Sequence, residues 1–333
     1  MPILKKLMFV LLFLLIGVPV VIWISSFASM DRELTFTQSV SKLPDFGWTT
    51  GNAVTISNIQ ANGMAFRIRA AGGGGSQGNV ILLHGFPESS VMWKPIMPKL
   101  ANAGFQTLAF DQRGYSPGAR PEGAGSYTVD QLIADVIAVA DAAGLDRFHL
   151  VGHDWGAGVG WGLVLSKNPR VISWTALSIP HMAAFAEAIQ SDPDQQSKSA
   201  YMGFFRTPVV PETLFTFNGL AMLDGLYSDH LPETKAEYLA MFAEPGALTA
   251  ALNWYRASGA IDGSAPDDAS VKVPTLFIWG NQDPAVGVHS VTAQRKYFSN
   301  NLTEIELDTG HWIMETHAET VGAAVLLHIM SHP

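Results

Sequence analysis

An aspartate at the centre of a glycine-flanked turn is the residue of this chain that points most directly to chemistry. Asp154 lies in the run Gly-His-Asp-Trp-Gly at 152–156, after apolar residues 148–151 and before a small-residue segment at 159–166. A strand, a Gly-x-Asp-x-Gly turn and a helix form the frame of a nucleophile elbow, which usually has serine at its centre. A carboxylate can displace a leaving group from a saturated carbon, and water can then cleave the ester that results.

Two further residues follow predicted strands in the chain order that a nucleophile, acid and base have in this frame. Asp283 comes after the apolar run 274–280, and His311 comes after a short strand pattern at 305–307. In such a set the acid orients the histidine, and the histidine takes a proton from water. Asp308 is a competing acid because it lies close to His311 in the sequence. We predict Asp283 as the acid and His311 as the base.

Ester hydrolysis develops negative charge on oxygen, and two backbone N–H groups are predicted to stabilise it. The apolar strand at 79–83 runs into His-Gly-Phe-Pro-Glu-Ser at 84–89. In the α/β-hydrolase fold the loop after this strand provides one donor, and the residue after the nucleophile provides the other. These donors would be the N–H groups of Phe86 and Trp155.

The elements that must position these residues alternate between strand and helix, which predicts βαβ units and a parallel sheet. From 181 to 268 the strand patterns vanish, and Met, Phe, Tyr and Ala become frequent. This segment predicts a helical cap over the carboxyl ends of the strands, where ligands bind in open α/β sheets. The predicted fold is α/β, an α/β-hydrolase fold whose mostly parallel sheet is flanked by helices, with core segments at 45–180 and 269–333 and the cap at 181–268.

The first 30 residues are a separate segment. Lys5 and Lys6 precede an uncharged apolar run at 7–24, whose 18 residues would span roughly 27 Å as a helix, close to the hydrocarbon core of a bilayer. We predict an N-terminal transmembrane helix that anchors an extracytoplasmic catalytic domain. A signal peptide cleaved near residues 26–28, which would release a secreted or periplasmic protein, is the alternative. Residues 31–46 predict a polar connector.

Composition excludes several other classes of function. The chain has 333 residues, a net charge of -9 and no block of Lys and Arg that would indicate a nucleic-acid surface. It has no cysteine, which excludes disulfides and thiol chemistry, and its histidines lack the spacing of a zinc motif. We therefore expect no cofactor, no metal and no nucleic-acid partner. The oligomeric state cannot be predicted from the sequence.

Together these motifs resemble the α/β-hydrolase-fold epoxide hydrolases over roughly residues 45–330, and they are shared in part with haloalkane dehalogenases. The resemblance implies that Asp154 opens a small apolar epoxide, and that water then releases a vicinal diol. The segments that carry it are 84–89, Asp-Gln-Arg-Gly-Tyr at 111–115, 152–156, and Gly-His-Trp at 310–312.

Two cap segments resemble those that carry the epoxide-binding tyrosines of this family. They are Tyr-Met-Gly-Phe-Phe-Arg at 201–206 and Leu-Asn-Trp-Tyr-Arg at 252–256, so the resemblance assigns this role to Tyr201 and Tyr255. Two phenol O–H groups can hydrogen-bond the ring oxygen as it leaves, and one can deliver a proton. Arg206 departs from the family, which commonly has glutamine there.

Two other functions stay open on the motifs alone. A haloalkane dehalogenase uses the same ester chemistry but binds halide through Trp155 and a second Trp or Asn, without paired tyrosines. A non-catalytic binding protein on this fold is expected to lose a member of the set formed by Asp154, Asp283 and His311, and the chain keeps all three.

Overall fold

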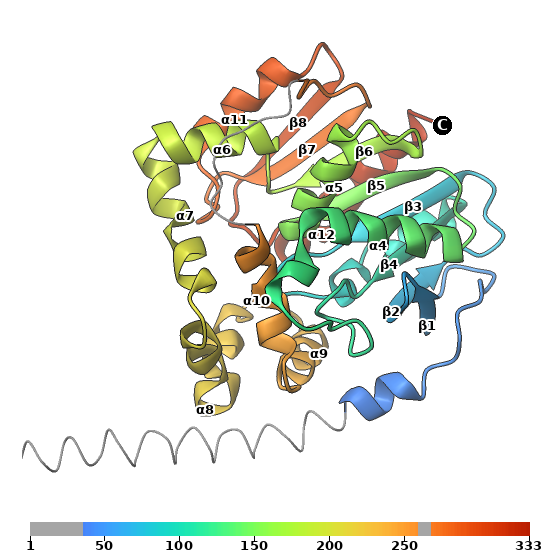
Figure 1. The fold of residues 1–333 in the computed structure, drawn as a ribbon. Coiled ribbons are helices and arrows are strands. Elements are labelled where there is room, and N and C mark those ends of the chain that lie inside the picture. The colour runs from blue at the N-terminus through green and yellow to red at the C-terminus, as the bar shows by residue number, and fades with distance from the viewer. Residues whose placement is uncertain (1–35, 259–267) are drawn as a thin grey trace, which may run out of the picture.

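The computed structural model of the protein describes residues 36–258 and 268–333 (Figure 1). Its centre is an eight-stranded sheet of order β1-β2-β4-β3-β5-β6-β7-β8, in which β2 is antiparallel to β1 and β4 and the remaining pairs are parallel. The predicted mostly parallel sheet is thus confirmed. The strands are β1 (Thr55–Ala61), β2 (Met64–Ala71), β3 (Gly78–Leu83), β4 (Phe105–Phe110), β5 (Phe148–His153), β6 (Val171–Leu177), β7 (Thr275–Gly280) and β8 (Leu302–Leu307).

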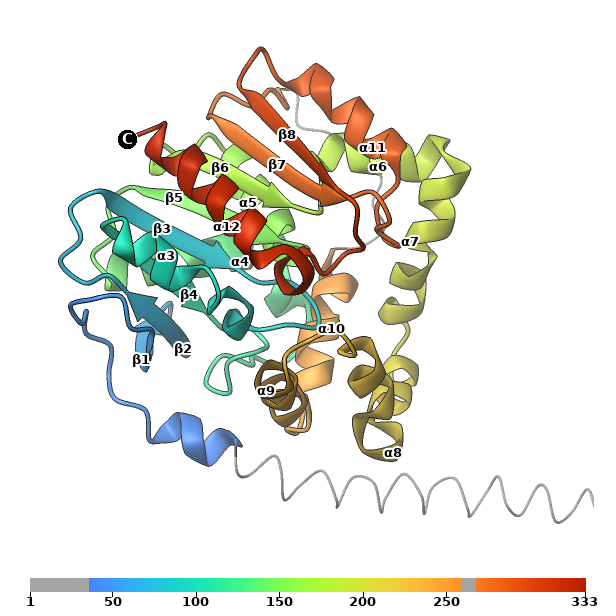
Figure 2. The ribbon, with the colours of Figure 1, turned by 180° about the vertical axis from the view of Figure 1, so that it is seen from behind.

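Helices cover both faces of the sheet, which explains why its central strands are continuous apolar runs. Val80, Ile81, Leu82 and Leu83 of β3 are all fully buried. Figures 1 and 2 show α4 and α5 on one face and α3 and α12 on the other. The helices of the core are η2 (Ser90–Trp93), α3 (Met97–Asn102), η3 (Ala124–Tyr127), α4 (Val129–Ala142), α5 (Trp155–Leu165), α11 (Val288–Ala293), η4 (Gln294–Tyr297) and α12 (Ile313–Met330).

Between β6 and β7 the described chain is helical, in the region predicted as a cap. In Figure 1 these helices lie beyond the carboxyl ends of the parallel strands. The backbone of α8 leaves helical geometry at residues 217–220, so this helix is bent. The cap helices are α6 (Met182–Ser191), α7 (Pro193–Arg206), α8 (Val210–Leu226), α9 (Pro232–Phe242) and α10 (Ala247–Ala257).

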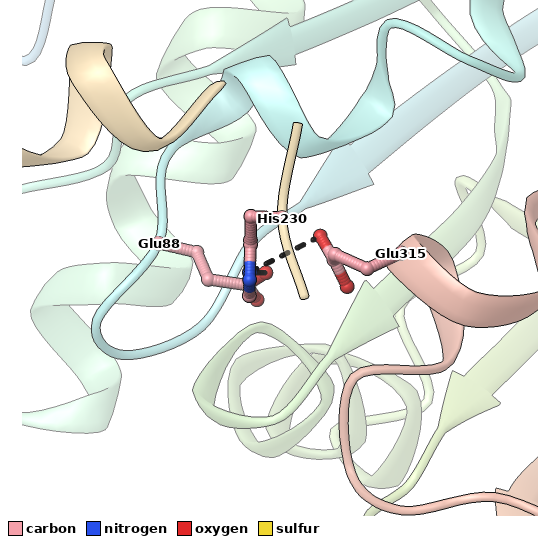
Figure 3. A group of neighbouring side chains, drawn as sticks. All are labelled: Glu88, His230 and Glu315. Atoms are coloured by element: carbon pink, nitrogen blue, oxygen red, sulfur yellow. Dashed lines mark ion pairs between the residues drawn. The ribbon is translucent and has the colours of Figure 1, made fainter. Parts of the chain in front are cut away.

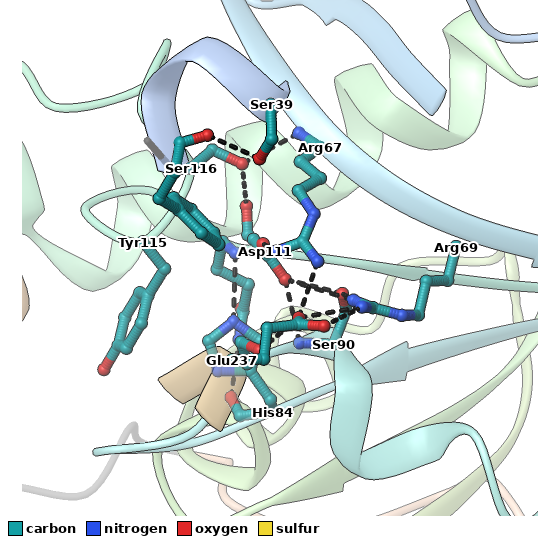
Figure 4. Close-up of polar contacts among 12 residues, drawn as sticks. Ser39, Arg67, Arg69, His84, Ser90, Asp111, Tyr115, Ser116 and Glu237 are labelled. Atoms are coloured by element: carbon teal, nitrogen blue, oxygen red, sulfur yellow. Dashed lines mark hydrogen bonds and ion pairs between the residues drawn. The ribbon is translucent and has the colours of Figure 1, made fainter. Parts of the chain in front are cut away.

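A buried cluster of charges connects the cap to the sheet (Figure 4). Arg67 and Arg69 of β2 donate hydrogen bonds to Glu237 of α9 at 2.6–2.8 Å. Arg67 also donates to Asp111, which follows β4, at 2.9 Å. Burial opposes the charge on Asp111, but the two arginines outweigh it and hold the pKa of Asp111 below its ordinary value. The cluster therefore holds α9 against β2 and the residues that follow β4.

Glu237→Gln should lower the free energy of unfolding by about 2 kcal/mol, because two buried guanidinium groups lose part of their compensating charge. Urea unfolding followed by tryptophan fluorescence would measure the change. Glu233→Gln, an exposed position on the same helix, is the matched control and should shift stability by less than about 0.5 kcal/mol. Equal effects of the two substitutions would show that the cluster does not stabilise the cap.

The segment before β1 differs from the predicted polar connector. Residues 36–41 are helical, and Phe36 and Val40 are buried in the core. These two residues are four positions apart and therefore share one helix face.

The predicted membrane segment at 7–24 lies outside the described residues. Within the ranges that the structure describes, no helix has the length and apolar character needed to cross a membrane.

Candidate active site

Asp154 occupies a strained bend between β5 and α5. Its φ and ψ are 50° and -120°, a conformation that residues with a side chain rarely adopt and that costs about 1–3 kcal/mol. Glycines make the bend possible, since a Cβ on Gly156 would collide with the backbone carbonyl of Leu83, and one on Gly152 would collide with the backbone of Gly156. This sharp bend directs the carboxylate away from β5 and α5, at the carboxyl ends of the strands.

The structure brings His311 between two carboxylates. His311 Nδ1 lies 2.7 Å from Asp283 Oδ2, and its Nε2 lies 3.6 Å from Asp154 Oδ2. The other oxygen of Asp283 accepts hydrogen bonds from the N–H groups of Ala285 at 2.7 Å and Val286 at 3.2 Å. Because Asp283 is held in this way and receives the Nδ1 proton, Nε2 is left to face Asp154.

The charges of this set depend on one another. Burial opposes a charge on His311, but Asp283 and Asp154 outweigh it and raise the pKa of the imidazole well above its ordinary value. Burial likewise opposes the charge on Asp154, and the hydrogen bond and charge of His311 reverse the effect, so the pKa of Asp154 is lowered. Asp154 is therefore ionised in the resting protein, as a nucleophile must be.

Asp308, the competing acid, lies on the surface. Its side chain is exposed and accepts a hydrogen bond from Gln282 Nε2 at 2.8 Å. Of the two candidate acids, Asp283 is therefore the one whose carboxylate contacts His311.

Asp283→Asn should slow turnover by about 10²–10⁴-fold, because an amide can no longer stabilise the imidazolium that forms during water activation. Asp308→Asn is the matched control in the neighbouring loop and should leave turnover unchanged. Steady-state kcat measured for both variants would separate the two acids. A large loss in Asp308→Asn, with Asp283→Asn near the wild type, would reverse the assignment.

One predicted oxyanion donor is already in contact with Asp154. The N–H of Phe86, in the loop after β3, donates to Asp154 Oδ1 at 2.8 Å. Trp155, the other predicted donor, is the first residue of α5, and N–H groups at a helix start point outward along the helix axis. Asp154 thus has one oxygen bound to a backbone donor and the other facing His311.

The predicted tyrosines come from two cap helices and lie near each other. Tyr201 is on α7, Tyr255 is on α10, and their ring centroids are 6.3 Å apart. The ring of Tyr255 lies 5.0 Å from that of Trp155 and 5.6 Å from that of Phe86. Burial raises the pKa of both phenols, and the charge of Asp154 raises it further. Both side chains are therefore neutral hydrogen-bond donors.

Arg206, the departure noted in the sequence, connects the helices that carry these tyrosines. Its Nε donates a hydrogen bond to the backbone carbonyl of Tyr255 at 3.2 Å. Because Arg206 ends α7 and Tyr255 lies near the end of α10, this bond ties the two helices together beside the site.

Sequence reasoning missed a buried pair that supports His311. His153 Nδ1 lies 2.9 Å from Glu88 Oε2, and its Nε2 lies 3.1 Å from the backbone carbonyl of His311. Burial opposes the charge on Glu88, but His153 outweighs it and lowers the pKa of that carboxyl. Both residues stood within the motifs at 84–89 and 152–156. Their positions close to Phe86 and Asp154 in the sequence could have indicated that they lie near the site.

Comparison with known proteins identifies the family of the chain. Residues 78–318 match the family described as alpha/beta hydrolase fold. The chain is also 31% identical to Epoxide hydrolase A of Mycobacterium tuberculosis, over 82% of this chain and 97% of that protein. The chain belongs to the α/β-hydrolase-fold epoxide hydrolase family. The resemblance stated from the motifs is thereby confirmed.

Other members of this fold family are similar over most of their length. The chain is 32% identical to the AB hydrolase superfamily protein YfhM of Bacillus subtilis, over 84% of this chain and 99% of that protein. A crystal structure of Bacillus megaterium epoxide hydrolase in complex with an inhibitor superposes with a TM-score of 0.73 at 25% identity, over 83% of this chain and 100% of that one. The matched region therefore covers nearly the full length of these two proteins.

Proposed function

We propose that this α/β hydrolase is a membrane-anchored epoxide hydrolase that opens a small apolar epoxide to a vicinal diol through an ester on Asp154. The observation that carries the proposal is an ionised carboxylate at an elbow together with two neighbouring neutral tyrosines, of which Tyr255 is buried beside Phe86 and Trp155 and Tyr201 is half-buried. This combination supplies both a nucleophile for carbon and a proton donor for a leaving alkoxide.

In the first half-reaction, Asp154 Oδ2 attacks a ring carbon and the bond from that carbon to the epoxide oxygen breaks. The electron pair goes to the oxygen, which takes a proton from Tyr201 or Tyr255. Asp154 Oδ1, already bound by the N–H of Phe86, becomes the carbonyl oxygen of the ester. Two phenol donors stabilise the developing negative charge in a buried site, where such stabilisation is large.

In the second half-reaction, His311 Nε2 takes a proton from water, and the hydroxide adds to the ester carbonyl carbon. The charge that develops on Oδ1 is stabilised by the N–H groups of Phe86 and Trp155. When this intermediate collapses, the bond from the carboxyl carbon to the substrate oxygen breaks, and that oxygen takes a proton from the His311 imidazolium and leaves as a hydroxyl group of the diol. The acid form of Asp154 then returns its proton to the tyrosinate, which restores both groups. In the resting protein the charge of Asp154 helps to raise the pKa of His311. Esterification of Asp154 removes this charge and lowers the pKa of His311. The imidazole therefore becomes easier to deprotonate at the step where it must act as a base.

A panel of aliphatic epoxides, aryl epoxides and haloalkanes tests this function with the purified full-length protein. Diol formation from epoxides without halide release from haloalkanes is the expected result. Halide release in the absence of epoxide turnover would replace the proposal with a dehalogenase. Absence of turnover on the whole panel would favour a binding protein on this fold.

The proposed anchor rests on the apolar run at 7–24 and on the lysines that precede it. Full-length protein should stay in the membrane pellet after a wash in carbonate at high pH, with the catalytic domain on the extracytoplasmic side. Protease added to intact spheroplasts tests the side of the membrane on which the hydrolase domain lies, because an extracytoplasmic domain should be degraded. Recovery of a soluble form that begins near residue 29 would instead establish a cleaved signal.

A further inference from the structure

A cluster of three ionisable side chains is buried behind His153, and no step of the proposed mechanism uses it (Figure 3). Glu88 lies in the loop after β3, His230 lies between α8 and α9, and Glu315 is in the first turn of α12. His230 Nε2 lies 3.6 Å from Glu315 Oε1 and 3.9 Å from Glu88 Oε1. Each residue offers one ligand atom, and the three atoms lie within 4.8 Å of one another.

Four buried polar atoms of this cluster lack hydrogen-bond partners. The side chains of Glu88 and His230 are fully buried, and that of Glu315 is 7% exposed. Glu88 Oε1, both ring nitrogens of His230 and Glu315 Oε2 are buried without a hydrogen bond. Each unsatisfied group of this kind costs about 1–3 kcal/mol. A buried imidazole and two carboxylates that face one another without hydrogen bonds therefore need a further partner.

We propose that Glu88, His230 and Glu315 form a binding site for a divalent transition-metal ion such as Zn²⁺. Ligands about 2.0–2.2 Å from one zinc ion, at angles near 109–120°, are separated by roughly 3.3–3.8 Å. The two nitrogen–oxygen distances come close to this range and exceed that of a hydrogen bond. One imidazole with two carboxylates favours Zn²⁺ and its neighbours over Mg²⁺ and Ca²⁺, which prefer oxygen ligands alone.

An ion at this site would join three separate segments of the protein. His230 belongs to the cap, whereas Glu88 and Glu315 belong to the core, so the bound ion would cross-link the cap to the core. Glu88 also holds His153 through its other oxygen. The ion would bind the native protein only, since the three ligands are far apart along the chain, and binding would stabilise the fold.

Isothermal titration of full-length protein with ZnCl₂, after removal of any tag and of bound metal with a chelator, tests the site. We expect one Zn²⁺ per chain, a melting temperature that rises with Zn²⁺, and visible absorption bands typical of nitrogen and oxygen ligands when Co²⁺ is used instead. His230→Phe and Glu315→Gln should each weaken binding by at least about tenfold, because each removes one of three ligands.

Two matched variants exclude other sources of binding. His289→Gln removes an exposed histidine and should bind Zn²⁺ like the wild type. Asp154→Asn removes a carboxylate of the candidate active site, a possible competing zinc site, and should also bind Zn²⁺ like the wild type. If His230→Phe fails to fold, Glu315→Gln decides the outcome. Absence of stoichiometric binding in the wild type, or binding that survives in the folded ligand variants, would overturn the proposal.

A second inference concerns an apolar surface on the cap. Most of the large apolar side chains that the described residues leave exposed lie between residues 209 and 231, with Val209 at 69%, Phe217 at 54% and Leu231 at 59%. Val210, Leu214, Met222 and Leu226 belong to the same set. A concentration of exposed apolar side chains in one segment is typical of an interaction site.

The position of this surface favours a lipid bilayer as the partner. Both views place α8 and residues 36–41 at the same end of the molecule, opposite the C-terminus (Figures 1 and 2). Only 11 residues separate the apolar run that ends at 24 from residue 36, and such a segment reaches at most about 40 Å. We infer, resting on the anchor proposed above, that α8 lies in the interface of the membrane in which the chain is anchored.

The absence of cysteine allows a single label to test this contact. A spin label on Phe217→Cys, in full-length protein reconstituted into nanodiscs, should be accessible to oxygen and shielded from a water-soluble nickel complex. A label on Ser331→Cys, exposed at the opposite end, is the control and should show the reverse. A water-exposed label at 217 in nanodisc-bound protein would overturn the contact alone. Protein recovered free of lipid would overturn both the anchor and the contact.

Discussion

Replacing His311 with glutamine should stop the reaction halfway and leave the substrate bound to Asp154 as an ester. Glutamine cannot take a proton from water, so the second half-reaction should slow by at least about 10²–10⁴-fold. The first half-reaction should continue, because Asp154 keeps its carboxylate and the bond from the N–H of Phe86. It should be slower than in the wild type, since loss of the His311 charge lets burial raise the pKa of Asp154. Mass spectrometry of the intact variant after incubation with an epoxide should show a mass increase equal to that of the epoxide.

Peptide mapping should place the added mass on Asp154. The double variant Asp154→Asn with His311→Gln is the matched control and should remain unmodified, because an amide does not attack carbon. An unmodified Asp154 in His311→Gln, with an epoxide that the wild-type protein turns over, would contradict the ester mechanism and with it the proposed function.

The fold and the order of the site residues were predictable because both leave local patterns. Strands buried on both faces read as continuous apolar runs, and a residue that follows such a strand must lie at the carboxyl edge of a parallel sheet. Asp154 and Asp283 each follow one of these runs, whereas His311 follows β8, a partly exposed edge strand of mixed apolar and polar residues. Choosing between Asp283 and Asp308 depends on the fold, because Asp308 lies in the same loop as His311, whereas the loop that carries Asp283 meets His311 only in the folded protein.

The buried cluster of Glu88, His230 and Glu315 was not predictable. Its members are separated by 142 and 85 positions in the sequence, and no local spacing relates them. The sequence analysis sought metal sites through short motifs, and therefore predicted none. The helix at 36–41 escaped prediction for a related reason, since one pair of apolar residues, Phe36 and Val40, is too short a pattern to establish a helical period.

Removing the hydroxyl groups of Tyr201 and Tyr255 should slow the first half-reaction. Each Tyr→Phe change removes one donor to the oxygen that develops negative charge, and loss of one such donor typically costs about 10²–10³-fold in rate. The remaining tyrosine can compensate in part, because the two rings are neighbours in the site. The double variant should therefore fall well below either single variant. Ester hydrolysis should change little, since the epoxide oxygen has already left.

Pre-steady-state measurement of alkylation and ester hydrolysis would separate the two half-reactions. Tyr238→Phe is the matched control, because Tyr238 is a buried cap tyrosine whose hydroxyl has no hydrogen-bond partner, and its loss should leave alkylation unchanged. If Tyr255→Phe slows alkylation and Tyr201→Phe does not, the role assigned to the segment at 201–206 is wrong, and the bond from Arg206 to the Tyr255 carbonyl would serve to position Tyr255 alone. If neither change affects alkylation, the tyrosine pair does not bind the epoxide oxygen.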